Sequence, residues 1–167
     1  MKGVGFSLWM VPEGDEQRRL ADLIESLARR FGRPVFEPHV TLLAGVREAQ
    51  RDVVARAEAL WRTREALPLR FIGLETDDTY FRALYLRVDP GPELLALHEA
   101  ARGAFGRGDD PPYVPHLSLM YGTPPPASVV EALRPPSPAG FEARTLDVYS
   151  TEGPVESWRR VHRLRVR

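Results

Sequence analysis

The chain has 167 residues, which is enough for one well-buried domain and too few for two ordinary independent domains. Its 23 basic and 23 acidic side chains cancel, which excludes a whole-molecule field of the kind that draws a protein onto long nucleic acid or an anionic membrane. There is no cysteine, so disulfides, thiolate metal sites and a cysteine nucleophile are excluded as well.

The first part of the chain alternates between strand-like and helix-like spacing. Residues 3–11 alternate with a period of two, which predicts a strand rather than a signal peptide. Apolar residues then follow helical spacing over 15–31, and Gly32 ends that run. We expect a short strand over 38–44 and a second amphipathic helix over 47–65.

The rest of the chain continues in the same way. The later elements are, in order, strands over 68–76 and 80–89, a helix over 92–105, a strand within 113–122, a short helix bracketed by prolines, and strands over 140–149 and 156–166. This order predicts an α+β fold with a rough internal duplication, within a single two-lobed domain of residues 1–167. No stretch approaches the roughly 18 to 20 apolar residues that span a bilayer, so we expect a cytoplasmic monomer with no membrane and no obligate protein partner.

Two of the four histidines occur in nearly the same local sequence. Residues 36–45 read FEPHVTLLAG and residues 113–122 read YVPHLSLMYG. In a strand, side chains at i and i+2 share a face about 6.6 Å apart, so His39 should point with Thr41, and His116 with Ser118. The apolar residues between them should face the opposite, buried side, and the preceding prolines favour an extended start to each strand.

Two such strands facing each other would supply two imidazoles and two hydroxyls to one small cavity. Hydrolysis of a phosphodiester needs a group that takes a proton from water, a group that gives one to the leaving oxygen, and donors for the other phosphate oxygens. Imidazole, with an ordinary pKa near 6.5, serves either proton-transfer role at neutral pH. A lone histidine on a strand is more often structural, but the repeat favours a paired catalytic role for His39 and His116.

The paired motifs resemble the HxTL and HxSL signatures of the two-histidine (2H) phosphoesterase superfamily, which includes LigT-like RNA 2′,3′-cyclic phosphodiesterases. The segments SLWMVPEG, FEPHVTL, PYVPHLSLMYG and SWRRV are most similar to the plant- and yeast-type cyclic phosphodiesterases, over essentially the whole chain. The resemblance implies a bilobal fold in which two pseudo-symmetric lobes line a central cleft with antiparallel sheets, and helices pack outside. It also implies hydrolysis of nucleoside 2′,3′-cyclic phosphates or ADP-ribose 1″,2″-cyclic phosphate without metal or other cofactor.

By the same resemblance, His39 and His116 form the acid–base pair, with His116 activating water and His39 protonating the leaving oxygen. Thr41 and Ser118 would hold the phosphate, and Tyr121 would line the cleft. The residues alone do not decide which histidine is the acid. Tyr80 and Phe81 are further candidates to flank the base or sugar, although aromatic strand residues more often belong to a core.

The remaining histidines and the arginine-rich tail point to structural roles. We expect His98 to be partly buried on a helix and His162 to lie on a strand face, and the arginines of RRVHRLRVR to form the solvated side of an edge strand. A metal site on His39 and His116 would lack a third ligand, so none is expected.

Two rival functions stay open beside the cyclic phosphodiesterase that acts on a small nucleotide. One is an enzyme that acts on an RNA 3′ end, and the other is a binding module for nucleotides or RNA ends without turnover. Neutral net charge argues against a long RNA groove. Turnover in EDTA separates the enzyme from the binding module.

Overall fold

A computed structural model of the chain describes residues 1–133 and 140–166. The strands are β1 (Phe6–Val11), β2 (Val40–Val46), β3 (Leu67–Thr76), β4 (Leu84–Val88), β5 (His116–Met120), β6 (Gly140–Ala143), β7 (Thr145–Ser150) and β8 (Arg159–Arg165). The helices are α1 (Gly14–Phe31), α2 (Gln50–Trp61), α3 (Pro92–Ala104) and α4 (Ala127–Ala132), and two 3₁₀ turns are η1 (Tyr80–Arg82) and η2 (Val155–Ser157).

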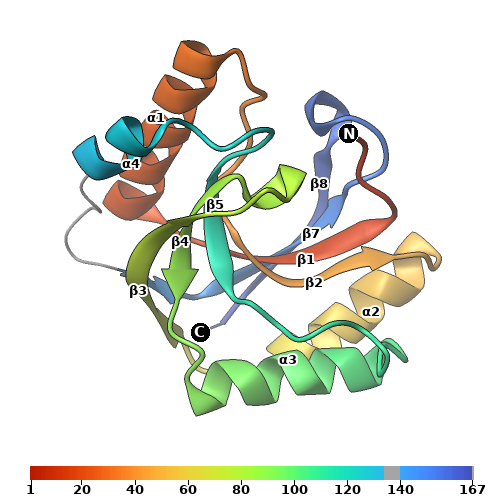
Figure 1. Cartoon of the computed structure of the whole chain (residues 1–167). Helices are drawn as coiled ribbons and strands as arrows, with labels where there is room; N and C mark the ends of the chain where they lie inside the picture. The colour runs from red at the N-terminus through yellow and green to blue at the C-terminus, as the bar shows by residue number, and fades with distance from the viewer. Residues whose placement is uncertain (134–139, 167) are drawn as a thin grey trace.

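The strands form one antiparallel sheet in the order β6-β3-β4-β5-β2-β1-β7-β8. It consists of two four-stranded halves, which meet where β2 pairs with β5 through a single residue pair, Val40 with Leu117. The sheet is curved, with α1 and α4 on one side of the molecule and α2 and α3 on the other (Figure 1). The predicted α+β fold with two similar halves and outer helices is confirmed, and the two predicted sheets are joined into one.

Each half sends a helix to the other half. Helix α1 follows β1 and packs on β5, whereas α3 follows β4 and packs on β2. Leu20, Ile24 and Leu27 form the buried stripe of α1, and the helix ends at Gly32, whose left-handed φ of 61° lets its N–H bond to the Ala28 carbonyl. The exchange of helices holds the two histidine strands side by side.

The core confirms the expected facing of the motif residues. Val40, Leu42 and Leu117 are fully buried, and Leu119 is nearly so. Their burial fixes the register of β2 and β5, because a slip by one residue would turn these side chains to the open face. No helix within the described residues is long and apolar enough to cross a membrane.

The strand predicted over 140–149 is wrong as one element, because it breaks at Arg144. Strand β6 pairs with β3 at one end of the sheet, while β7 pairs with β1 and β8 near the other end. The Arg144 carbonyl at the break accepts hydrogen bonds from Trp61 Nε1 and from the Val166 N–H. Alternating hydrophobicity continues through this point and cannot reveal that the chain changes its pairing partner.

Two other predicted strands begin later than expected. The segments 80–89 and 156–166 each start with a 3₁₀ turn, so β4 begins at Leu84 and β8 begins at Arg159. The second proline-rich flank of α4, residues 134–139, lies outside the described residues. The two 3₁₀ turns place aromatic side chains at the histidine site.

Candidate active site

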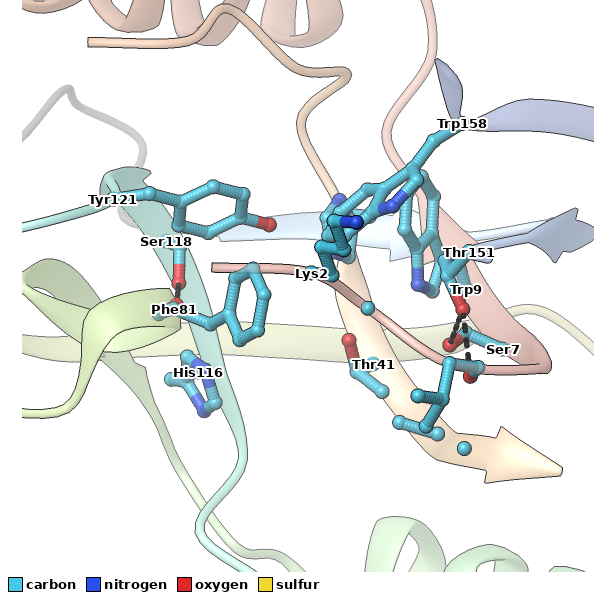
Figure 2. Close-up of a pocket in the computed structure, with 15 residues that line it drawn as sticks. Lys2, Ser7, Trp9, Thr41, Phe81, His116, Ser118, Tyr121, Thr151 and Trp158 are labelled. Carbon is cyan, nitrogen blue, oxygen red and sulfur yellow. Dashed lines mark hydrogen bonds between the residues drawn. The ribbon is translucent and has the colours of Figure 1, made fainter. Parts of the chain in front are cut away.

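The pairing of β2 with β5 brings the two histidine motifs together. His39 directly precedes β2 and His116 begins β5, and both imidazoles line a cavity of about 370 Å³ at the junction of the two halves. Thr41, Ser118 and Tyr121 line the same cavity. Figure 2 shows His116, Ser118 and Tyr121 on one side of it and Trp9 on the other, with Thr41 between them.

Both imidazoles are held by the same local device. The Nδ1 atom of His39 donates to the Glu37 carbonyl at 2.6 Å, and the Nδ1 atom of His116 donates to the Val114 carbonyl at 2.7 Å. In each motif a proline stands between the histidine and this carbonyl, and its ring restricts the turn that brings the two together. Because Nδ1 carries the proton in this arrangement, Nε2 is the nitrogen left to exchange a proton with a substrate.

The His39 ring is enclosed by aromatic side chains. It is 6% exposed and lies flat on Trp9, with ring centroids 3.6 Å apart and an interplanar angle of 7°. Tyr149 stacks on the other face of Trp9 at 3.9 Å. Burial lowers the pKa of His39 to about 3, assisted by the charge of His116 and opposed by the bond to Glu37.

The His116 ring lies in a more open and more charged setting. The edge of Tyr85 meets it with ring centroids 5.4 Å apart. Burial lowers the pKa of His116, the Val114 carbonyl raises it, and the charges of Arg82 and Asp77 act in opposite directions. With both pKa values lowered, both imidazoles are neutral in the empty cavity at neutral pH.

The two hydroxyls of the motifs are not equivalent. Ser118 Oγ donates to the Phe81 carbonyl at 2.7 Å, so its proton is engaged. Thr41 lines the cavity, and two side chains donate hydrogen bonds to the backbone of β2 next to it. Tyr113 donates to the Thr41 carbonyl at 2.8 Å, and His98 donates to the Leu42 carbonyl at 2.9 Å.

Tyr121 lies in the cavity wall just beyond β5. It is 3% exposed and stacks on Phe36 at 3.7 Å, and its hydroxyl points into the cavity (Figure 2). Burial raises the pKa of Tyr121 far above the ordinary phenol value, so the phenol keeps its proton and can donate it in a hydrogen bond. Of the two aromatic candidates in η1, Phe81 lines the cavity, and Tyr80 packs behind it at 5.0 Å.

The sequence reasoning missed several wall residues. Trp9 and Trp158 supply aromatic surface, Ser7 and Thr151 line the end of the cavity nearest β1 and β7, and the Lys2 side chain reaches between this end and Tyr121 (Figure 2). The alternation of residues 3–11 places Trp9 opposite the core-facing Leu8, but it does not tell which side holds the site. Phe81 and Trp158 come from the turns η1 and η2 of opposite halves and approach to 5.6 Å.

The other two histidines have structural partners. His98 is buried and stacks on Tyr113 at 3.8 Å, which agrees with the expected structural role. His162 Nε2 lies 3.2 Å from a carboxylate oxygen of Glu58 on α2. Within residues 1–133 and 140–166, no group of three or more histidine, aspartate or glutamate side chains is arranged to hold a metal ion.

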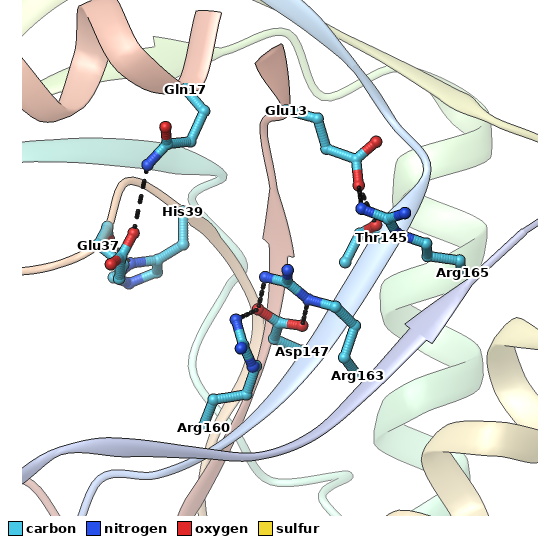
Figure 3. Close-up of polar contacts among 9 residues, drawn as sticks. All are labelled: Glu13, Gln17, Glu37, His39, Thr145, Asp147, Arg160, Arg163 and Arg165. Carbon is cyan, nitrogen blue, oxygen red and sulfur yellow. Dashed lines mark hydrogen bonds and ion pairs between the residues drawn. The ribbon is translucent and has the colours of Figure 1, made fainter.

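A second group of charged residues lies behind the His39 loop (Figure 3). Arg163 on the edge strand β8 makes two bonds of 2.7 Å to Asp147, which is 1% exposed, and Arg160 lies 3.8 Å from the same carboxylate. Arg165 pairs with Glu13 at 2.9 Å. The arginines of the tail up to Arg165 thus lie on an edge strand, as expected, and these three are paired with carboxylates, while Arg167 lies outside the described residues.

Known proteins that are similar to this chain in sequence are cyclic phosphodiesterases, the family that the histidine motifs resemble. The sequence profile of the family described as cyclic phosphodiesterase-like protein matches residues 4–134. A cyclic phosphodiesterase of Arabidopsis thaliana is 27% identical over 70% of this chain and 64% of its own length, so the chain spans less than two thirds of that relative. A 2′,3′-cyclic-nucleotide 3′-phosphodiesterase of Kluyveromyces lactis is 28% identical over 97% of this chain and 86% of its own.

Solved structures share the fold at low sequence identity. LigT of E. coli superposes with a TM-score of 0.66 at 15% identity, covering 99% of both chains. TT0787 of Thermus thermophilus superposes with a TM-score of 0.68 at 18% identity, covering 97% of both chains. Since the family profile matches most of the sequence, including both histidine motifs, the chain belongs to the cyclic phosphodiesterase-like protein family.

Proposed function

We propose that the protein hydrolyses a cyclic phosphodiester to a phosphomonoester by acid–base catalysis with His39 and His116. The observation that carries this proposal is the pair of imidazoles held through Nδ1 by the same backbone device on one cavity. A water oxygen forms a bond to phosphorus, the bond from phosphorus to one ring oxygen breaks, and that oxygen gains a proton. The two imidazoles supply the proton acceptor and the proton donor, so the proposed reaction involves no metal or other cofactor.

We assign His116 as the base and His39 as the acid. A bound phosphodiester anion raises the pKa of a neighbouring imidazole, and the flat face of Trp9 stabilises the His39 imidazolium. The pKa of about 3 that His39 has in the empty cavity opposes this assignment, because an acid must hold its proton until it donates it. The charge of the bound substrate and the contact with Trp9 both act to raise this pKa.

The phosphate oxygens would be held by hydroxyl donors. Thr41 has its hydroxyl at the cavity and Tyr121 points its phenol into it, whereas Ser118 must turn from the Phe81 carbonyl to donate. Donors aimed at developing charge in a site with little water each lower the barrier by up to about 3 kcal/mol. Thr41, Ser118 and Tyr121 are therefore proposed as substrate-binding residues.

The names of the relatives support the substrate class. Those found in Arabidopsis thaliana and Kluyveromyces lactis are named for cyclic phosphodiesters and 2′,3′-cyclic nucleotides, and LigT of E. coli has been solved complexed with 3′-AMP. We accordingly propose a nucleoside 2′,3′-cyclic phosphate or ADP-ribose 1″,2″-cyclic phosphate as substrate. A cytoplasmic, monomeric protein that acts as one domain is part of the same proposal.

The second candidate is action on an RNA 3′ end that carries a 2′,3′-cyclic phosphate. It is favoured because Lys2 and Ala44 line the cavity and are themselves exposed, so that a longer chain could leave the site past them. The third is a binding module that keeps the cavity without turnover.

The test is turnover of 2′,3′-cyclic AMP, ADP-ribose 1″,2″-cyclic phosphate and a short RNA with a 2′,3′-cyclic end, in EDTA. We expect phosphomonoester product from at least one of them, and a loss of roughly 10²- to 10⁴-fold in kcat for His39→Ala and for His116→Ala. His162→Ala is the matched control, because this histidine pairs with Glu58 outside the cavity. Full activity in both cavity variants, or no activity in the wild type, would contradict the proposal.

A further inference from the structure

The cavity has polar groups at both ends and aromatic side chains between them. His116 and Ser118 lie at one end, on β5, and Ser7 and Thr151 lie at the other, beside β1 and β7. Figure 2 shows this separation, with the rings of Phe81 and Trp158 along the wall between the ends. A ligand that fills the cavity therefore presents a different part of itself to each end.

The backbone of Lys2 adjoins Gly3, which pairs with the chain beyond β7, and its side chain extends toward the middle of the cavity (Figure 2). Lys2 is the single lysine of a sequence with 22 arginines, and it lines the cavity. None of the arginines in residues 1–133 and 140–166 lines this cavity. With both imidazoles neutral in the empty site, the Lys2 ammonium is the cation that the described cavity wall offers to an anionic ligand.

The backbone next to Lys2 is held in place. Gly3 and Gly153 exchange two hydrogen bonds, of 2.8 and 3.1 Å, which fasten the N-terminal segment to the chain beyond β7. A Cβ atom on Gly3 would lie 2.3 Å from the Thr151 carbonyl oxygen and 2.8 Å from the Trp158 ring. The segment thus packs directly against the aromatic wall, and this contact positions Lys2 over the cavity.

The Lys2 ammonium is available for a ligand. It makes no hydrogen bond or ion pair with any residue in the described part of the chain. The neighbouring hydroxyls are engaged with each other and with backbone: Ser7 and Thr151 share a bond of 3.0 Å, and Thr151 donates to the Gly5 carbonyl at 3.1 Å. An anion at this end would therefore meet Lys2 as its principal donor.

The backbone that carries this cation lies away from the two strands that carry the imidazoles. The phosphorus must lie within reach of imidazoles on β2 and β5, whereas Gly3 pairs beyond β1, next to β7. Neighbouring strands lie about 4.8 Å apart, so two strand positions separate β2 from β7. A ligand group that meets Lys2 on the side of its backbone belongs to the part of the substrate that leads away from the cyclic phosphate.

We propose that Lys2 forms a subsite for a second anionic group, a phosphate carried on the 5′ oxygen of the cyclic-phosphate nucleotide. This inference rests on the proposed function and names the substrate class of the same site. It predicts a preference for nucleotides that bear a 5′-phosphate ester over nucleosides that bear a free 5′ hydroxyl.

The experiment compares adenosine 2′,3′-cyclic phosphate with its 5′-phosphorylated form. We expect the wild type to favour the 5′-phosphorylated substrate by about fivefold in kcat/KM, as one charge pair at a partly exposed site is worth about 1 kcal/mol. Lys2→Met should abolish this ratio and Lys2→Arg should keep most of it. Gly3→Ala should reduce the ratio as well, because it displaces an unchanged lysine.

Arg47→Met is the matched control, because it removes one positive charge from an exposed residue that follows β2 and does not line the cavity. It should leave the ratio as in the wild type. A wild-type ratio of one, or an equal loss of ratio in Lys2→Met and Arg47→Met, would overturn the subsite.

A binding measurement keeps this inference separate from the proposed activity. Calorimetric dissociation constants of 2′-AMP and adenosine 2′,5′-bisphosphate should differ by a similar factor in the wild type and not in Lys2→Met. If neither cyclic substrate is turned over but this binding difference is present, the catalytic proposal fails and the subsite stands. If turnover occurs and neither measurement depends on Lys2, the subsite fails and the catalytic proposal stands.

Discussion

The two histidine motifs share their backbone geometry and differ in what covers them. Each imidazole donates from Nδ1 to the carbonyl two residues upstream, across a proline. His39 is 6% exposed and its ring lies flat on Trp9, while the rings of His116 and Tyr85 meet at an interplanar angle of 71° and the charges of Arg82 and Asp77 act on the pKa of His116. Corresponding strands thus place two similar groups, and the ring that the neighbouring strand presents, Trp9 on β1 or Tyr85 on β4, gives each group a different environment.

The largest expected effect is a loss of kcat that depends on the leaving group of the substrate. A substrate whose leaving group needs no proton distinguishes the histidine that acts as the acid from the one that acts as the base. We compare a 2′,3′-cyclic nucleotide with a nucleoside 3′-(p-nitrophenyl phosphate), whose p-nitrophenolate leaves without a proton. On the cyclic substrate His39→Ala and His116→Ala should each lose roughly 10²- to 10⁴-fold in kcat. On the p-nitrophenyl ester His39→Ala should lose about tenfold or less, and His116→Ala should keep its full loss.

The reverse pattern would exchange the two roles. Equal losses on both substrates in both variants would show that neither histidine acts by protonating the leaving group. Release of p-nitrophenolate, followed by its absorbance, gives the rate directly.

The next largest effect concerns stability against pH. The pKa of His39 is about 3 in the folded chain and near 6.5 when unfolded, so the unfolded state binds more protons between these values. Stability is therefore highest above about pH 6.5 and falls as the pH drops towards 3. Between pH 6.5 and 4.5 we expect the wild type to lose about 2 kcal/mol more unfolding free energy than His39→Gln, measured by urea titration.

His116→Gln should remove a smaller part of this slope, because its ring is less enclosed than that of His39. His162→Gln controls for the loss of a histidine outside the cavity. Identical slopes in the wild type and His39→Gln would contradict the burial of a neutral imidazole.

The two motif hydroxyls should differ in catalysis. Thr41→Val removes a hydroxyl that lines the cavity and should lower kcat/KM about tenfold, the value of one hydrogen bond to a charged oxygen. Ser118→Ala should lower it only about threefold, because its proton is engaged by the Phe81 carbonyl, and should instead cost about 1 kcal/mol of unfolding free energy. A catalytic loss in Ser118→Ala as large as that in Thr41→Val would show that the bond to the Phe81 carbonyl does not reduce what the serine contributes to substrate binding.

The smallest effect should come from the ring contacts. Trp9→Leu removes the face that lies on His39 and should lower kcat about fivefold with little change in KM, because stacking and cation–π contacts are worth about 1 kcal/mol. Tyr85→Leu removes only an edge contact with His116 and should change kcat less than about twofold. A shift of the His39 titration followed by NMR in Trp9→Leu, absent in Tyr85→Leu, would identify Trp9 as a positioning residue.

Strand periodicity was sufficient to predict the two motifs and most of the elements around them. The alternation in 36–45 and 113–122 correctly separates the cavity-facing His39 and Thr41 from the buried Val40 and Leu42. The prediction succeeds because each of these strands has one buried face, which requires an apolar residue at every second position.

The parts that could not be predicted depend on contacts between distant segments. The hydrophobic pattern around Lys2 and Trp158 does not mark either residue as part of the cavity, since both reach it through pairing of the N-terminal segment with the chain around Gly153. The break at Arg144 has the same origin, because it depends on which strands β6 and β7 meet. The bond from each imidazole to the carbonyl two residues upstream could have been predicted from the sequence, because the same Pro-His pair occurs in both motifs.

The place of β1 in the sheet has a consequence for how the site is assembled during folding. Strand β1 lies between β2 and β7. Its pairing with β7 can form only after more than a hundred further residues have been synthesised. Both histidine strands are made before β7 and η2 arrive to support Trp9 and bring in Trp158. A growing chain therefore carries both imidazoles before it has a closed wall around them, and the cavity becomes selective for a ligand only when the last hairpin docks.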